Sequence, residues 1–182
     1  MEYINVAFIG DDSVGKSTLI RSFMYGANND SMDLTNFENY QELVKVGDKT
    51  YTLNIWDTKN IQHLINVDVF VLCYSIISIN SYNNIKGIWL KEIGKINPNA
   101  KIVIVSTKCD LRTSNSMVNL VLRNTVYMLP TSNLINLSHI LKTPYIQECS
   151  SFENLGIEEV FVNVIKAYNS KKKTNKWCCG LI

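Results

Sequence analysis

Residues near the N-terminus combine glycines, a lysine and hydroxyl side chains in a pattern suited to binding phosphate. Residues 10–18 read GDDSVGKST and fit the phosphate-binding pattern G-x-x-x-x-G-K-[ST]. Glycines at both ends let the backbone curl, so that successive N–H groups point at phosphate oxygens. Lys16 can reach the β- and γ-phosphates, and the Ser17 hydroxyl can hold Mg²⁺. The residues expected to contact the ligand here are Asp12, Ser13, Val14, Gly15, Lys16, Ser17 and Thr18.

The segments on either side of this loop have the hydrophobic character of a strand and a helix. Residues 3–9 (YINVAFI) resemble a strand, and residues 19–23 (LIRSF) resemble the inner part of a helix. A helix beginning near Lys16 would add the positive end of its dipole to the phosphate site. The alternative interpretation is a solvent-exposed turn, but the strand–loop–helix context favours the binding site.

A second group of polar residues, STKCD at 106–110, directly follows an apolar strand-like segment. Ligands of α/β sheets bind beyond the carboxyl ends of the strands. The Asp110 carboxylate can accept two hydrogen bonds, from the N1–H and the exocyclic amine of guanine, and adenine cannot offer that pair. The alternative is a turn with a helix-capping Asp. Because the group follows a phosphate loop, we favour recognition of a guanine base.

Strand-like and helix-like segments alternate along the chain, which predicts an α/β fold. We expect a six-stranded, mostly parallel sheet with one antiparallel edge strand from a hairpin, and helices on both faces. The expected strands are 3–9, 42–46, 50–56, 67–74, 102–105 and 145–148. Further helices are expected at 81–96, within 113–129, and at 156–168, and the first has apolar residues at helical spacing, namely Ile85, Ile88, Trp89 and Ile93.

Composition and charge are those of a globular domain with a basic end. The 182 residues are 46% hydrophobic and 19% charged, with a formal net charge of +2. Lys171, Lys172, Lys173 and Lys176 contribute +4, so the other residues carry −2. We therefore expect a globular domain at 1–170 that does not bind nucleic acid, and a basic tail at 171–182. The five cysteines show neither zinc spacing nor a disulfide pattern, and we find no signal-peptide or membrane-spanning pattern, which favours a reducing, cytoplasmic setting.

Several of these motifs together resemble the small GTPases of the Ras superfamily, in particular Rho and Rac relatives. Residues 107–110 (TKCD) are similar to the guanine-specificity motif N/T-K-x-D, and 56–58 (WDT) to the start of W-D-T-A-G-Q. Residues 35–40 (TNFENY) resemble the Rho switch I sequence, and 148–151 (ECSS) resemble E-C-S-A. The stretch 113–147 is long enough to include the extra insert helix of Rho proteins.

The resemblance implies a P-loop G domain that binds GTP or GDP with Mg²⁺ and acts as a signalling switch of the actin, cytoskeletal or polarity type. It implies that Ser17, Thr35 and Asp57, the last through water, would hold the Mg²⁺ ion. Residues 35–40 would bind effectors, and exchange factors, activating proteins and a dissociation inhibitor are further expected partners. The residues that it adds to the nucleotide site are Thr35, Asp57, Thr107, Lys108, Asp110, Leu111, Ser150 and Ser151.

The hydrolytic parts of the family pattern are altered in this chain. Ile61 occupies the position of the Gln that orients the attacking water, and Asn60 that of the Gly that meets the γ-phosphate. Asp57 and Asp68 are only eleven positions apart, which is a shorter interval than in Rho relatives, so most of the switch II helix would be missing. Four positions expected to contact the nucleotide also differ from the family pattern. Asp12 and Ser13 are altered in the phosphate loop, Asn28 replaces an aromatic residue that packs on guanine, and Met32 replaces a Tyr.

These departures predict slow or absent hydrolysis, with Lys16 and Thr35 only assisting and no residue assigned as catalytic. A pseudo-GTPase, a binding module held in one conformation or binding nucleotide poorly, is the alternative. A P-loop kinase is disfavoured because its substrate lid needs several arginines, and the chain has only Arg21, Arg112 and Arg123.

The C-terminus resembles a polybasic segment followed by a CaaX prenylation motif. Cys179 would carry the isoprenoid, geranylgeranyl by its final Ile182, and Cys178 could be palmitoylated. A prenyl chain together with Lys171–Lys173 and Lys176 would hold an anionic membrane stably. We therefore expect the protein at the cytoplasmic face of a membrane, the plasma membrane above all, and in the cytosol.

Overall fold

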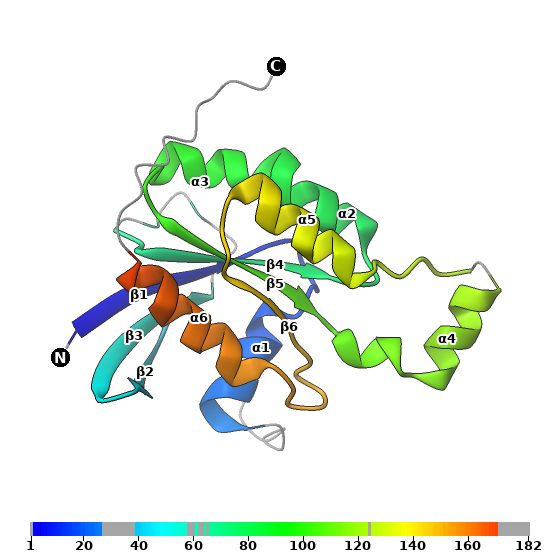
Figure 1. Ribbon diagram of the computed structural model, residues 1–182, viewed down its shortest axis with the longest axis horizontal. Coiled ribbons are helices and arrows are strands. Elements are labelled where there is room, and N and C mark those ends of the chain that lie inside the picture. Colours follow the sequence, from blue (N-terminus) through cyan, green and yellow to red (C-terminus); the bar gives the residue numbers. More distant parts are fainter. Residues whose placement is uncertain are drawn as a thin grey trace.

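A six-stranded sheet forms the centre of the computed structural model, which describes residues 2–26, 39–57, 61, 64, 66–123 and 125–170 (Figure 1). Its strand order is β2-β3-β1-β4-β5-β6. Strands β2 and β3 pair antiparallel, and the other neighbours pair parallel. This arrangement confirms the predicted sheet. The strands are β1 (Glu2–Ile9), β2 (Asn39–Val46), β3 (Lys49–Asp57), β4 (Val69–Ser75), β5 (Lys101–Thr107) and β6 (Ile146–Glu148).

The burial of each strand follows its position in the sheet. All seven residues of β4, which lies between β1 and β5, are buried, as expected for an apolar strand covered on both faces. In β2, at the edge, burial varies along the strand, and Leu43 is well exposed. Gly47 makes the hairpin turn between β2 and β3 with a φ of 60°, in the left-handed region that glycine adopts most readily.

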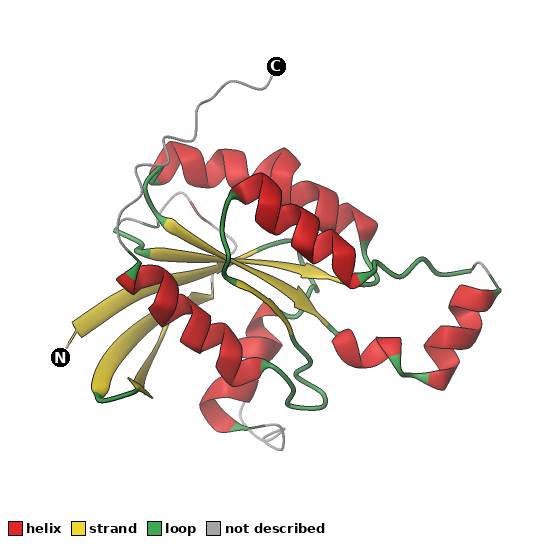
Figure 2. Cartoon of the chain, in the orientation of Figure 1, coloured by secondary structure: helices red, strands yellow, loops and turns green. Residues whose placement is uncertain are grey.

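Helices cover both faces of the sheet (Figures 1 and 2). On one face, α1 and α6 pack over a core that includes the ring of Phe161, stacked on Phe23 with centroids 3.5 Å apart. On the other face, α2, η2, α3 and α5 cover a second core. The helices are α1 (Lys16–Tyr25), α2 (Ile79–Asn84), the π-helical turn η2 (Ile85–Trp89), α3 (Leu90–Ile96), the 3₁₀ turn η3 (Cys109–Arg112), α4 (Asn115–Leu122), α5 (Thr131–Leu141) and α6 (Ile157–Asn169).

The predicted helix at 81–96 is not a regular α-helix, since a π turn interrupts it. Ile85 and Ile93 are buried as predicted, but Ile88 is 47% exposed. The prediction was wrong at Ile88 because this residue lies within the π turn, whose wider spacing turns its side chain away from the face that holds Ile85. Trp89 is half-buried against the second core.

The stretch 113–147 contains two helices where the sequence predicted an extra helix. Helix α4 lies within the expected segment 113–129, stands out from the body in Figure 1, and has no buried residue. Helix α5, which the sequence analysis did not place, packs on the sheet through Leu134, Leu137 and Leu141.

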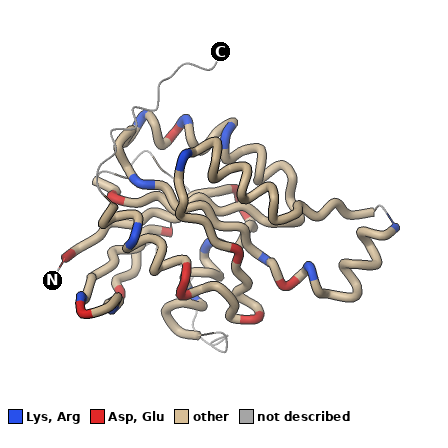
Figure 3. The backbone as a smooth tube through the Cα atoms, viewed as in Figure 1, with Lys and Arg blue, Asp and Glu red and all other residues tan. Residues whose placement is uncertain are grey.

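Positions of Lys or Arg and of Asp or Glu are interspersed along the described part of the backbone (Figure 3). None of the helices in the described ranges has the length and apolar character needed to cross a membrane.

Candidate nucleotide-binding site

The phosphate loop lies between the carboxyl end of β1 and the first turn of α1, as predicted. Three of its residues have a positive φ, namely Gly10 at 151°, Ser13 at 61° and Gly15 at 104°. A Cβ atom on Gly10 would lie only 2.2 Å from the Cys73 carbonyl oxygen of β4. The tight curl of the loop therefore requires glycine at its first position, while Ser13 holds a backbone conformation that costs a side-chain-bearing residue on the order of 1 kcal/mol or more.

Lys16 is held in place by the same loop. Its Nζ donates hydrogen bonds to the carbonyls of Gly10 (2.8 Å) and Asp11 (2.7 Å), and the residue is 7% exposed. An ammonium group has three N–H donors, so a third remains for a phosphate oxygen. The first backbone N–H groups of α1 and the positive end of its dipole point to the same side. The arrangement would fit a bound phosphate.

Thr107 and Lys108 bind the phosphate loop to the loop that follows β5. The Thr107 hydroxyl lies within hydrogen-bond distance of the carbonyls of Val14 and Tyr74, and Lys108 Nζ donates to the Ser13 carbonyl at 2.9 Å. Lys108 adopts a φ of 63°, which directs the chain into η3. The phosphate loop and the loop after β5, which the sequence indicated separately, therefore lie side by side and contact each other directly.

The Asp110 carboxylate is held by a residue that follows β6. The Ser150 hydroxyl donates to Asp110 Oδ1 at 2.6 Å, and the Glu153 N–H donates to the Ser150 Oγ at 3.1 Å. An ionised carboxylate offers about four lone pairs, so it retains acceptors for the two adjacent donors of guanine. Leu111 lies half-buried beside it in η3, and the Ser151 carbonyl accepts a hydrogen bond from Ser22 of α1 at 3.4 Å.

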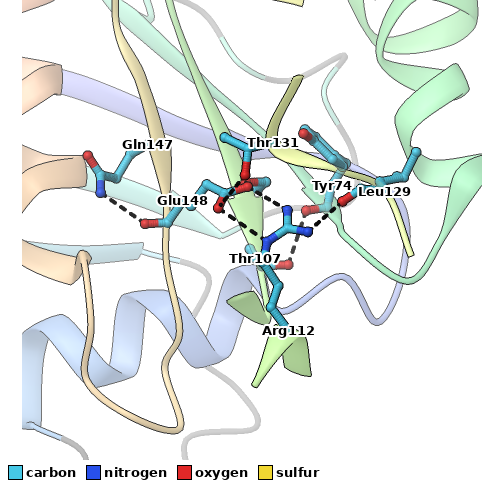
Figure 4. A network of polar contacts seen from close by, with 8 residues as sticks. Tyr74, Thr107, Arg112, Leu129, Thr131, Gln147 and Glu148 are labelled. Carbon is cyan, nitrogen blue, oxygen red and sulfur yellow. Dashed lines mark hydrogen bonds and ion pairs between the residues drawn. The ribbon is translucent and has the colours of Figure 1, made fainter. Parts of the chain in front are cut away.

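A polar network around Arg112 and Glu148 supports the loop that follows β5 (Figure 4). Arg112 donates to Glu148 through Nη2 (2.7 Å) and Nε (3.4 Å), and through Nη1 to the Leu129 carbonyl (2.8 Å). The hydroxyls of Ser106 and Thr131 each donate to Glu148 at 3.2 Å. The network therefore fixes η3 to β6 and to the start of α5. The sequence analysis gave Arg112 no role in the site.

We expect Arg112→Ala to lower the free energy of unfolding by about 2 kcal/mol, because the substitution leaves the partly buried Glu148 carboxylate short of a charged partner. Urea unfolding measures the loss. The matched control is Lys95→Ala, which removes the exposed ion pair to Glu92 and should cost less than about 0.5 kcal/mol. Equal effects of the two substitutions would show that the network adds no stability.

Ser17 and Asp57 are the described residues suited to Mg²⁺. Ser17 lies half-buried in the first turn of α1, and Asp57 ends β3 beside Phe8 of β1. Burial raises the pKa of Tyr40, and the negative charge of Asp57 raises it further, while Arg21 partly offsets both effects. The Asp57 carboxylate therefore lies near Tyr40, at the start of β2. A hydroxyl and a carboxylate are hard oxygen donors, which fit a Mg²⁺ ion that keeps several waters and substrate oxygens.

Ile61 faces the core and not the phosphate loop. It is 7% exposed and packs in the second core with Leu64 and Val67, both also buried. The residue at the position of the expected Gln therefore has an apolar side chain, and that chain lies among other apolar groups. Neither property allows it to orient a water molecule.

The three described thiols, Cys73, Cys109 and Cys149, are free, and two of them are fully buried. Burial raises the pKa of Cys73 to about 12 and also raises that of Cys149. At Cys109, beside Asp110, burial and next the carboxylate of Glu148 raise the pKa. All three are protonated at neutral pH, so none has the thiolate that a nucleophile or metal ligand needs.

Several predicted residues lie outside the described part of the chain. They are Thr35 and the residues of 35–40 before Asn39, together with Asn28, Met32, Thr58, Asn60, and the tail with Lys171–Lys173, Lys176, Cys178 and Cys179.

Sequence reasoning missed the partners of Asp11. Its carboxylate is bound by Asn84 and Trp89, whereas the sequence analysis named Trp89 only as one of the apolar residues of a helix. No spacing rule could have found this pair, because residues five apart do not share a face of a regular α-helix.

The strand–loop–helix at β1, the buried Lys16, and Asp110 beyond β5 together define a P-loop nucleotide-binding domain of the G type. A model of the Ras family matches residues 5–170. The chain therefore belongs to the Ras family of small GTPases. Proteins of this family generally bind GTP and GDP with Mg²⁺ and interact with effectors, exchange factors and activating proteins.

Proposed function

We propose that this protein is a Rho-like guanine-nucleotide switch that acts at a membrane and hydrolyses GTP slowly or not at all. The burial of Ile61 carries the proposal of slow hydrolysis. In small GTPases a Gln at this position orients the attacking water, and the transition state depends on positioning and electrostatics. Here that contribution is absent, while Lys16, Ser17, Asp57 and Asp110 remain available for binding.

Side chains at the tip of the phosphate loop also disfavour cleavage. Asp12 and Ser13 are exposed at its tip. A carboxylate beside the phosphates is electrostatically unfavourable, and a side chain at this point narrows the space for a water or an incoming arginine.

Single-turnover hydrolysis of bound GTP tests the proposal. A small GTPase with its Gln in place hydrolyses GTP at a rate on the order of 10⁻⁴ to 10⁻³ s⁻¹. We expect this protein to be at least about tenfold slower, since one water-orienting group is worth that much or more. A rate within the ordinary range would contradict slow hydrolysis and leave nucleotide binding untouched.

Restoring glutamine should not restore hydrolysis. We expect Ile61→Gln to leave the single-turnover rate within about threefold and to cost about 1–3 kcal/mol of unfolding free energy, because an amide enters an apolar cluster. Ile61→Val is the control, with a cost of about 1 kcal/mol and no change in rate. A tenfold faster reaction with Ile61→Gln would show that side chain 61 can turn toward the nucleotide.

The Rho-like character and the membrane role rest on sequence outside the described residues. Residues 35–40 resemble the Rho effector segment, and its end, Asn39 and Tyr40, begins the edge strand β2. The basic tail with Cys179 supports attachment to an anionic leaflet. Mass spectrometry of the protein from eukaryotic cells tests the lipid on Cys179, and Cys179→Ser with membrane fractionation tests its consequence.

The second candidate is a pseudo-GTPase, favoured by the shortened interval after Asp57 and by Asn28. Nucleotide analysis of the purified protein separates the two. Stoichiometric GDP would reject a form that is permanently bound to GTP, whereas absence of nucleotide together with no measurable GDP affinity would reject the switch.

A further inference from the structure

Asp11 in the phosphate loop is held through both oxygens of its carboxylate by a single helical segment. Asn84 Nδ2 at the end of α2 donates to Oδ2, and Trp89 Nε1 at the end of η2 donates to Oδ1, each at 2.8 Å. Hydrogen bonds to an ionised carboxylate are among the stronger ones in proteins. We name Asp11, Asn84 and Trp89 the Asp11 clamp.

The π turn is what brings the two donors together. Residues five apart in a regular α-helix, at about 100° each, point about 140° away from one another. A π turn links residues five apart by its own hydrogen bond, here from the Leu90 N–H to the Ile85 carbonyl. Asn84 and Trp89 therefore project from the same side of the helix. Such turns are rare and often mark functional positions.

The clamp connects the two helical layers across the phosphate loop. Lys16 begins α1, which packs in the first core, whereas Asn84 and Trp89 belong to the helix that packs in the second core. The Asp11 side chain accepts hydrogen bonds from the helix of the second layer, and its backbone carbonyl accepts one from Lys16 Nζ at 2.7 Å. The orientation of that carbonyl is thereby fixed from both sides.

We propose that Asn84 and Trp89 are positioning residues for nucleotide binding, acting through Asp11. They keep the Asp11 carbonyl directed at Lys16 Nζ, so that the lysine presents its remaining N–H to a phosphate. They also keep the Asp11 carboxylate paired with donors of the second layer, where it repels the phosphates least. The inference rests on the proposed function, since it concerns the binding of the same nucleotide.

A purely structural role makes a different prediction from a positioning role. Packing of this helix comes mainly from the buried side chains Tyr82, Ile85 and Ile93, while Trp89 is only partly buried against the same core. Loss of packing would lower the thermal midpoint of unfolding, and the rate of nucleotide release would rise only in proportion to that loss of stability. Loss of positioning would change the release rate with little change in the midpoint of the nucleotide-free protein.

An exchange of partners tests the clamp by rescue. Asn84→Asp places a second carboxylate against Asp11 and should speed the release of a fluorescent GDP analogue about tenfold, as loss of about one charged hydrogen bond predicts. The double variant Asp11→Asn with Asn84→Asp restores the pair with donor and acceptor reversed, and the amide introduced at position 11 keeps an oxygen for the Trp89 N–H. Its release rate should return to within about threefold of the unaltered protein.

Two further variants complete the test. Trp89→Phe keeps the ring but removes the N–H, and should speed release about threefold to tenfold. Asn83→Asp is the matched control, since it makes the same chemical change at the exposed neighbouring residue and should leave release unchanged. Wild-type release by Asn84→Asp, or a double variant as fast as the single one, would overturn the proposal.

Amide hydrogen exchange of residues 10–16 in nucleotide-free protein keeps this test separate from the proposed function. If the unaltered protein binds no GDP analogue, the proposed function fails, but the clamp still predicts faster exchange in Asn84→Asp and its reversal in the double variant. Equal exchange in all three proteins would overturn the clamp by itself.

Discussion

Replacing Asp110 by Ala is expected to lower the affinity for GDP by a factor of about 100 or more. The carboxylate would accept two hydrogen bonds from guanine, and bonds to a charged group contribute about 1.5–3 kcal/mol each. Their loss amounts to about 3 kcal/mol at least, and every 1.4 kcal/mol is about tenfold. Titration of a fluorescent GDP analogue into nucleotide-free protein measures the change.

The selectivity between bases makes this result specific to recognition. The affinity for ADP should change little, because adenine offers no matching pair of donors, so the ratio of GDP to ADP affinity should collapse. Ser150→Ala, which removes only the hydroxyl that orients Asp110, should weaken GDP binding about tenfold. Asp48→Ala in the exposed β2–β3 turn is the control. GDP affinity retained within about threefold by Asp110→Ala would show that the base is bound elsewhere.

Local patterns predicted most of the fold and the two ends of the site. The apolar runs that became β4 and β5 are buried on both faces, so composition alone identified them. The sequence indicates the loop at 10–18 and Asp110 as candidate binding residues because each motif is short and its chemistry depends on residues close in sequence. Helix α5 also had a local signal, in Leu134, Leu137 and Leu141 after Pro130, which the analysis of 113–147 overlooked.

Contacts between distant residues were beyond that reasoning. Arg112 and Glu148 are 36 positions apart, and Asp11 and Trp89 are 78 apart. Nothing in the sequence near either residue indicates its partner, because the sheet brings them together. The hydrophobic spacing of 81–96 also gives no sign of the π turn at Ile85–Trp89. The burial of Ile61 likewise depends on the second core, not on its neighbours.

Replacing Gly10 by Ala is expected to have the largest effect on stability. The added Cβ would lie 2.2 Å from the Cys73 carbonyl oxygen, and the φ of 151° is one that side-chain-bearing residues rarely adopt. The clash is with backbone atoms of a paired strand, since Ile9 lies beside Leu72 in the β1–β4 register. Because a backbone carbonyl cannot swing aside as a side chain can, the overlap is relieved only by separating the strands or reshaping the loop.

We therefore expect Gly10→Ala to lose about 3 kcal/mol or more, a large share of the roughly 5–15 kcal/mol typical of a domain. Urea unfolding measures the loss, and the soluble yield measures it if no folded protein remains. Two glycines serve as matched controls. Gly94→Ala in α3, with open space around its Cβ position, should stabilise by about 0.5–1 kcal/mol. Gly47→Ala, with a φ of 60° but open space, should cost about 1 kcal/mol. If Gly10→Ala costs no more than Gly47→Ala, then the conformation alone, and not the close approach of β4, requires glycine at this position.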